Sequence, residues 1–167
     1  MVRITPFFCA ATEMARDIIQ FYMALTQNIP EHPLEHYLYN KLTCTETLAT
    51  PANKINTMEV YVDDFIAATN NNTPTNITKF SRVMLHGIHS IFPPPLITHH
   101  DGGDPISEKK LKKQEGLWET KKEILGWDID GQAYTIQLPT QKEIKLQTLI
   151  TNTYRKKAVP LKTFQKL

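Results

Sequence analysis

The sequence of 167 residues predicts an α+β fold. Apolar residues recur at helical spacing in three stretches, whereas two other stretches combine β-forming residues with acidic or glycine-containing turns. An apolar share of 41% is enough for a sizeable core in one domain, with or without a small appendage. The elements are expected in the following order along the chain.

A first helix is expected to begin at Thr5-Pro6, with threonine as N-cap and proline in the first turn. Its predicted buried stripe consists of Ala15, Ile18, Ile19, Tyr22 and Leu25. Pro30 and Pro33 end this segment. Residues 34–50 are expected to form weak helix or loop.

A β-hairpin is expected next, with arms Met58–Val62 and Phe65–Thr69 and with Asp63 and Asp64 between them. Adjacent carboxylates repel each other and must be hydrated or bound by a cation. A hairpin tip would project both side chains, and Mg²⁺ prefers hard oxygen ligands of this kind. Two such ions about 4 Å apart stabilise the attacking and leaving oxygens of phosphoryl transfer. The alternative is an ordinary acidic turn, where Asp is common.

The composition of Asn70–Asn76 indicates a loop. The second helix that follows has an apolar face made of Phe80, Val83, Met84, Gly87, Ile88 and Ile91. Pro93–Pro95 stop this helix, and Ile106–Trp118 is expected to hold a short strand or a turn of helix.

The stretch Thr98–Pro105 raises the question of a second metal site, since it contains His99, His100, Asp101 and Asp104. Its clustered Gly and Pro residues favour a mobile loop instead, because zinc sites generally use spaced ligands on firm elements.

A second hairpin is expected, with arms Ile124–Trp127 and Tyr134–Leu138 and with Asp130-Gly131 at its tip. Thr140–Glu143 matches a capping box, so a helix should begin there. The apolar face of that helix comprises Ile144, Leu146, Leu149 and Ile150. A basic loop and the beginning of another amphipathic helix are expected at Tyr154–Pro160 and Leu161–Leu167.

Charge divides the chain, although the net charge is only +2. Residues 1–104 carry a net −4 and residues 105–167 a net +6. This division suits a protein that grips a polyanion and acts on it with a metal ion, or else a solvated lysine-rich surface. Cys9 and Cys44 have no metal-binding spacing, which favours reduced thiols.

The compartment expected for the protein is intracellular, either cytoplasm or nucleus, and it is not expected to be secreted. The sequence contains no apolar run near the ~18 residues of a membrane span, and its first residues lack the long apolar region of a secretory signal. Mean hydropathy is −0.35, and no membrane partner is expected.

The tetrapeptide Tyr61–Asp64 between its apolar arms resembles the polymerase signature of reverse transcriptases. Upstream, "TPFFCAATEMARD" resembles the Ser-Pro stretch that opens the helix before the catalytic hairpin, with Thr5 at the serine position. Downstream, "KEILGWDIDG" resembles the Leu-Gly hairpin that holds the primer end. "YTIQLPTQKEIKLQTLI" is similar to the first thumb helix, and "VPLKTFQKL" to the segment beyond it. The order matches the family from about Ile4 to Leu167.

The resemblance implies an RNA-directed DNA polymerase of a eukaryotic retroelement. Such an enzyme uses Mg²⁺ or Mn²⁺, an RNA or DNA template-primer and deoxynucleoside triphosphates. Asp63 and Asp64 would be the catalytic metal ligands, Asp63 the firmer of the two. The remaining implied contacts with nucleic acid are Tyr61, Val62, Gly126, Trp127, Arg155, Lys156 and Lys157.

Two further sets of residues have an alternative beside the role that the resemblance implies. Phe7 and Phe8 would border the nucleotide pocket, or else belong to the core. One of four lysines could protonate the leaving pyrophosphate, or all four could form a solvated face: Lys109, Lys110, Lys112 and Lys113.

The family pattern implies a partial polymerase palm over residues 1–138, including the second, primer-grip-like hairpin, and the start of a helical thumb or connection over residues 139–167. The first catalytic aspartate of the family precedes the helix that begins near Thr5, and no candidate strand, fingers or expected glycine precedes it here. We therefore expect a fragment that is inactive alone and needs the missing upstream polymerase region in cis or in trans. The alternatives are a degenerate, non-catalytic remnant that at most binds nucleic acid through its basic half, and an unrelated acidic-hairpin interaction protein.

Overall fold

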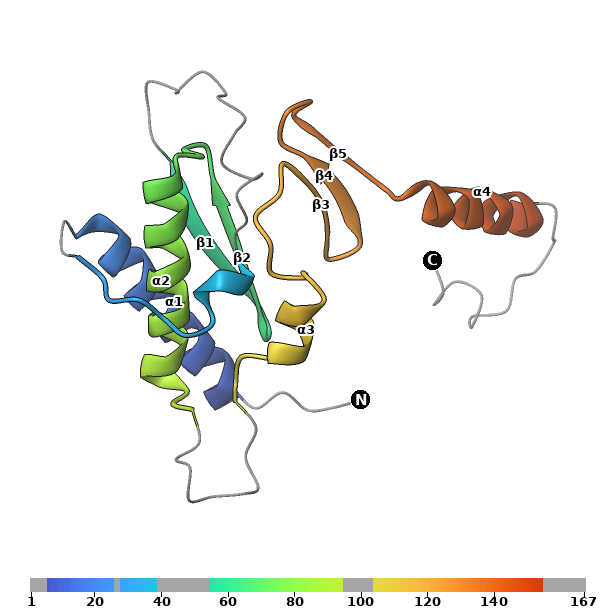
Figure 1. Cartoon of the computed structure of the whole chain (residues 1–167). Helices are drawn as coiled ribbons and strands as arrows, with labels where there is room; N and C mark the ends of the chain where they lie inside the picture. Colours follow the sequence, from blue (N-terminus) through green and yellow to red (C-terminus); the bar gives the residue numbers. More distant parts are fainter. Residues whose placement is uncertain (1–5, 26–27, 39–54, 95–103, 155–167) are drawn as a thin grey trace. The chain divides into compact units, whose positions relative to one another are not determined.

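A computed structural model describes residues 6–25, 28–38, 55–94 and 104–154, and these form a mixed α+β structure (Figure 1). The chain divides into two compact units, Met1–Trp118 and Glu119–Leu167. This division differs from the expected palm and thumb limits at residue 138, which remain a prediction.

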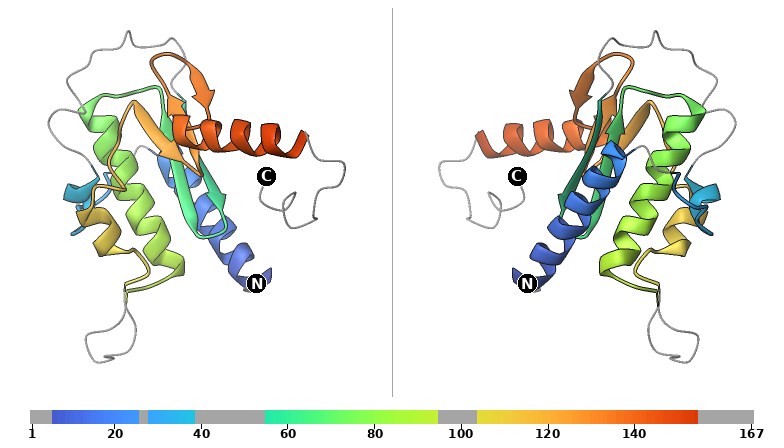
Figure 2. Two further views of the ribbon diagram at one scale, coloured as in Figure 1. Left: turned by 90° about the vertical axis from the view of Figure 1, so that its right-hand side faces the viewer. Right: turned by 90° about the vertical axis from the view of Figure 1, so that its left-hand side faces the viewer.

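In its described residues, the first unit contains two long helices, a β-hairpin and two short helical turns. Its elements are α1 (Pro6–Ala24), the 3-10 turn η1 (Glu35–Tyr37), β1 (Asn56–Tyr61), β2 (Asp64–Thr69), α2 (Pro74–Ile91) and α3 (Glu108–Lys112). The hairpin is antiparallel, and α1 packs along both α2 and β1 (Figures 1 and 2).

The core of this unit lies where α1, α2 and one face of the hairpin meet. Its buried side chains are Ile19, Met58, Phe80, Val83 and Ile88. Phe65 and Ala67 of β2 also pack against this cluster. A Cβ atom at Gly87 would lie 2.3 Å from Cγ1 of Ile19, so α1 and α2 approach closely because position 87 has no side chain.

A second cluster connects the segment around η1 with α2 and α3. Leu38, Leu85 and Leu111 are buried together. Trp118 packs against both clusters. Its backbone N–H donates to the Leu38 carbonyl (3.0 Å), and its indole N–H donates to Ser81 (2.9 Å).

Both predicted helices of this unit form, but their limits and buried faces differ in part. Helix α2 begins at Pro74, earlier than the predicted Asn70–Asn76 loop allows, because Thr73 is its N-cap and accepts a hydrogen bond from the Asn76 N–H (3.4 Å). Placing Tyr22 in the buried stripe of α1 was wrong, since it is 37% exposed. Leu25 follows the helix.

The second unit is a three-stranded antiparallel sheet followed by a helix. Its elements are β3 (Lys121–Ile124), β4 (Trp127–Asp130), β5 (Thr135–Gln137) and α4 (Thr140–Tyr154), with strand order β3-β4-β5. The prediction of Ile124–Trp127 as one arm was wrong, because the chain reverses within it. Leu125 (φ 50°) and Gly126 (φ 83°) form a two-residue turn of the kind that joins twisted strands.

Helix α4 begins where the sequence predicts, although the capping differs. The Pro139 carbonyl accepts hydrogen bonds from the backbone N–H groups of Lys142 and Glu143, which places Pro139 before the helix and Thr140 within it. The predicted apolar face is only partly covered in this unit, since Ile144 is 57% and Ile150 51% exposed. In the first unit, α3 is the turn of helix expected within Ile106–Trp118.

Candidate functional site

The register of the β1–β2 hairpin places the two aspartates at its tip. Tyr61 pairs with Asp64, so Val62 and Asp63 alone form the turn. The prediction that Val62 belongs to the first arm was therefore wrong. Met58 and Phe65 face the helices, whereas Tyr61 and Asp64 are exposed at the turn end of the hairpin.

The backbone at Val62 is strained. Its φ angle is 63°, in the left-handed region that a β-branched residue rarely adopts. A two-residue turn with positive φ at its first position normally places Gly there. Strain of this kind costs about 1–3 kcal/mol and is concentrated at functional sites.

Among the residues that the structure describes, the carboxylates of Asp63 and Asp64 have no partner. Both residues are exposed, and in the part of the chain that the structure describes neither side chain accepts a hydrogen bond or forms an ion pair. Both carboxylates are therefore available to water or a cation.

Asp130, in the second unit, shows what an ordinary acidic turn looks like in the same chain. Its carboxylate accepts hydrogen bonds from the N–H groups of Ala133 (2.9 Å) and Gln132 (3.0 Å). These bonds, that from Ala133 above all, together with Lys121 at 3.7 Å, hold the pKa of Asp130 below its usual value. Among the described residues, no backbone N–H of the Val62-Asp63 turn donates to the Asp63 carboxylate in this way.

The tip brings together two carboxylates and an exposed phenol. Tyr61 is 60% exposed and stands opposite Asp64 across the hairpin. Within residues 6–25, 28–38, 55–94 and 104–154, no three His, Cys, Asp or Glu side chains gather into a metal-binding group. Two carboxylates could hold Mg²⁺ only together with water or with the phosphate oxygens of a substrate.

The β3–β4 turn carries the predicted primer-grip residues. Trp127 is 47% exposed and begins β4. The Gly126 carbonyl accepts a hydrogen bond from Lys142 Nζ of α4 (3.1 Å), and the same ammonium lies 2.7 Å from Glu123. Sequence reasoning missed Lys142, because nothing in its spacing indicates that it ties the turn to α4.

The predicted nucleotide-pocket residues lie at the beginning of α1, and the four candidate lysines lie at α3. Phe7 lies in the first turn of α1, and the ring of Phe8 lies 5.8 Å from that of Phe92. That contact joins the beginning of α1 to the end of α2. The four candidate lysines lie on or beside α3, where Lys112 forms an ion pair with Glu108 (2.9 Å).

Several predicted residues lie outside the described residues: Arg155, Lys156, Lys157, His99, His100 and Asp101. Asp104 of the same candidate metal loop is described. It accepts hydrogen bonds from His89 Nε2 (3.1 Å) and from the Ile106 N–H (2.7 Å). Of the predicted site residues, Tyr61, Val62, Asp63 and Asp64 lie together at the tip of the β1–β2 hairpin.

Comparison with family models, with curated proteins and with solved structures finds no match to this chain. In the described ranges, no helix is both long enough and apolar enough to cross a membrane.

Proposed function

We propose that this chain belongs to an RNA-directed DNA polymerase, in which Asp63 and Asp64 bind divalent cations at the end of a growing DNA strand. The observation that carries the proposal is the pair of adjacent, exposed carboxylates at a two-residue hairpin tip, which have no partner among the residues that the structure describes. Like charges held at such a tip are stabilised when a cation binds between them. The strained backbone of Val62 is a second feature typical of a functional turn.

The proposed reaction is nucleotidyl transfer. A primer 3′ hydroxyl attacks the α-phosphate of a deoxynucleoside triphosphate, and the bond to pyrophosphate breaks. Mg²⁺ or Mn²⁺, when bound, neutralises charge on the attacking and leaving oxygens. Asp63 serves as the principal ligand, Asp64 assists or orients it, and Tyr61 supports the primer end, so that positioning and electrostatics provide the rate.

In this proposal, Asp63 and Asp64 are two of the three carboxylates that the family pattern uses. The third would come from residues that the structure does not describe or from another polypeptide, and the fingers likewise. The proposed catalytic unit is therefore this chain together with an upstream polymerase region, in cis or in trans.

Primer extension tests the proposal. The chain is fused to the fingers and first palm strand of a retroelement polymerase and assayed with Mg²⁺, template-primer and deoxynucleotides. Asp63→Asn should reduce extension by at least a hundredfold, because the principal ligand loses its charge. Asp130→Asn serves as the matched control, since it changes an aspartate at another hairpin turn. Extension that survives Asp63→Asn would remove the assigned role.

A second candidate function is nucleic-acid binding without catalysis. It is favoured by the net charge of +6 over residues 105–167. Binding of single-stranded RNA or DNA should then weaken steeply with salt and be unchanged in Asp63→Asn. If no binding is measured at low salt, this alternative fails.

A further inference from the structure

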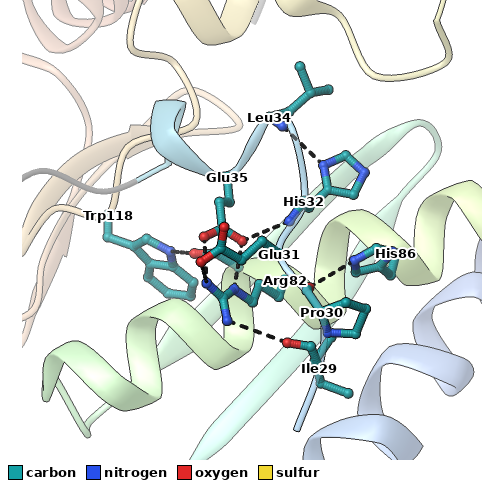
Figure 3. Close-up of polar contacts among 10 residues, drawn as sticks. Ile29, Pro30, Glu31, His32, Leu34, Glu35, Arg82, His86 and Trp118 are labelled. Carbon is teal, nitrogen blue, oxygen red and sulfur yellow. Dashed lines mark hydrogen bonds and ion pairs between the residues drawn. The ribbon is translucent and has the colours of Figure 1, made fainter.

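Three imidazoles meet where the segment of residues 28–38 packs against α2. His32 belongs to that segment and is only 6% exposed, whereas His86 and His89 lie one turn apart on α2. The ring of His32 lies 4.8 Å from that of His86 and 4.9 Å from that of His89. Figure 3 shows His32 and His86 on facing segments. Asp104, from the stretch before α3, completes the cluster.

The hydrogen bonds of this cluster fix where each proton lies. The Leu34 N–H donates to Nδ1 of His32 (3.1 Å), so that nitrogen carries no proton. Nε2 of His32 therefore carries the proton and donates to Nδ1 of His89 (3.1 Å). Nε2 of His89 in turn donates to Asp104 (3.1 Å). One chain of bonds runs from Leu34 to Asp104, and each link determines the next.

This chain of bonds has no place for an additional proton. A proton on Nδ1 of His32 would face the Leu34 N–H, and a proton on Nδ1 of His89 would face the Nε2–H of His32. Either one replaces a hydrogen bond with two opposed donors. Nε2 of His86 cannot take up the additional proton either, because its N–H already donates to the Pro30 carbonyl (3.1 Å; Figure 3).

We propose that His32, His89 and Asp104 form an acid-sensitive latch, which holds residues 28–38 against α2 at neutral pH and releases them as the pH falls. The inference is independent of the proposed polymerase function. It rests on three segments that are far apart in the sequence and are joined by bonds that require two neutral imidazoles.

Other charges around His32 do not cancel the effect. Glu35 and Glu31 of its own segment are engaged by Arg82 of α2, at 2.7 and 3.2 Å. Burial is the main reason that the pKa of His32 is lowered to about 4, and His86 and His89 lower it further, because a positive charge on either ring repels a second one on His32. Asp104 and Glu35 oppose that shift without overcoming it.

The direction of the pH effect follows from linkage. A released His32 has the ordinary pKa of 6.5, so below that pH it takes up a proton that the latched form takes up only near pH 4. The ratio of released to latched segment should therefore rise as the pH falls through this window. Between pH 7 and pH 5 the expected rise is roughly 20-fold.

Amide hydrogen exchange of the whole chain, measured by NMR and corrected for intrinsic exchange rates, tests the latch. Protection of the Leu34 and Leu38 amides should fall roughly 20-fold from pH 7 to pH 5, while the Leu85 amide of α2 keeps its protection. His32→Leu should abolish the pH dependence, because it removes the titrating ring. His36→Leu removes an exposed imidazole of the same segment and should leave the pH dependence intact.

A second measurement decides the question even if a variant fails to fold. Imidazole ¹⁵N spectra of the wild-type chain should show His32 and His89 both protonated at Nε2 at pH 7, with His32 titrating well below 6.5. A His32 that titrates normally, or protection that does not change between pH 7 and pH 5, would overturn the latch. Loss of the pH dependence in His36→Leu would overturn it too.

Discussion

Val62 is the residue at which the hairpin tip departs most from ordinary geometry. Its left-handed backbone is one that Gly adopts without penalty, whereas a β-branched residue is strained there by about 1–3 kcal/mol. A chain selected only for stability would favour Gly at this position. The strain therefore fits a turn whose shape and side chain serve binding.

Val62→Gly is expected to stabilise the protein, because relief of strain exceeds the ~0.5–1 kcal/mol of added chain entropy in the unfolded state. The net gain should be about 1 kcal/mol, or about 2–4 °C in Tm, measured by urea and thermal unfolding. Val60→Gly, in the adjacent strand, is the control and should destabilise, since it removes a partly buried side chain. Destabilisation by Val62→Gly would show that the turn is not strained.

Individual site residues differ in how visible they are in the sequence. Asp63 and Asp64 could be predicted, because adjacent carboxylates between β-forming stretches already indicate a charged hairpin tip. The contact between His32 and His89 could not, since it joins residues 57 positions apart and depends on how a loop packs on a helix. Lys142 was missed because its contact with the Gly126 carbonyl likewise depends on how a turn packs against a helix.

The spacing of apolar residues predicted which segments form helices and strands. The residues at which these elements begin and end depend instead on caps and turns. Thr73 and Pro74 form a recognisable helix start, but the polar composition of the stretch favoured a loop instead. The turn at Leu125-Gly126 was hidden within a run of apolar residues, because Leu at positive φ is rare. Tertiary packing also decided which side of α1 was buried.

The contact between α1 and α2 gives a prediction at this scale. Gly87→Ala should lower the free energy of unfolding by about 1–2 kcal/mol, because overlap with Ile19 costs more than the ~0.5–1 kcal/mol that Ala gains in a helix. The measurement is urea unfolding. In an Ile19→Ala background the same change should be neutral or stabilising, since the overlapping atoms are gone. Additive effects in the double variant would contradict the close helix approach.

Across the whole molecule, the acidic tip and the basic half belong to different parts of the chain. Asp63 and Asp64 lie in the first unit, whereas the net charge of +6 belongs to residues 105–167, of which residues 105–118 lie in the first unit and residues 119–167 in the second. The α+β class was predicted from alternating periodicities and is confirmed. The palm and thumb assignment remains a prediction, because it depends on a catalytic assembly larger than the described residues.

The most direct test of the central claim is Mn²⁺-induced broadening of backbone NMR signals in the whole chain. Millimolar Mn²⁺ should broaden Tyr61, Val62, Asp63 and Asp64 first, and Asp63→Asn should abolish that broadening. Asp130→Asn should leave it unchanged. Broadening that persists in Asp63→Asn, or that never reaches the hairpin tip, would contradict cation binding by the two carboxylates.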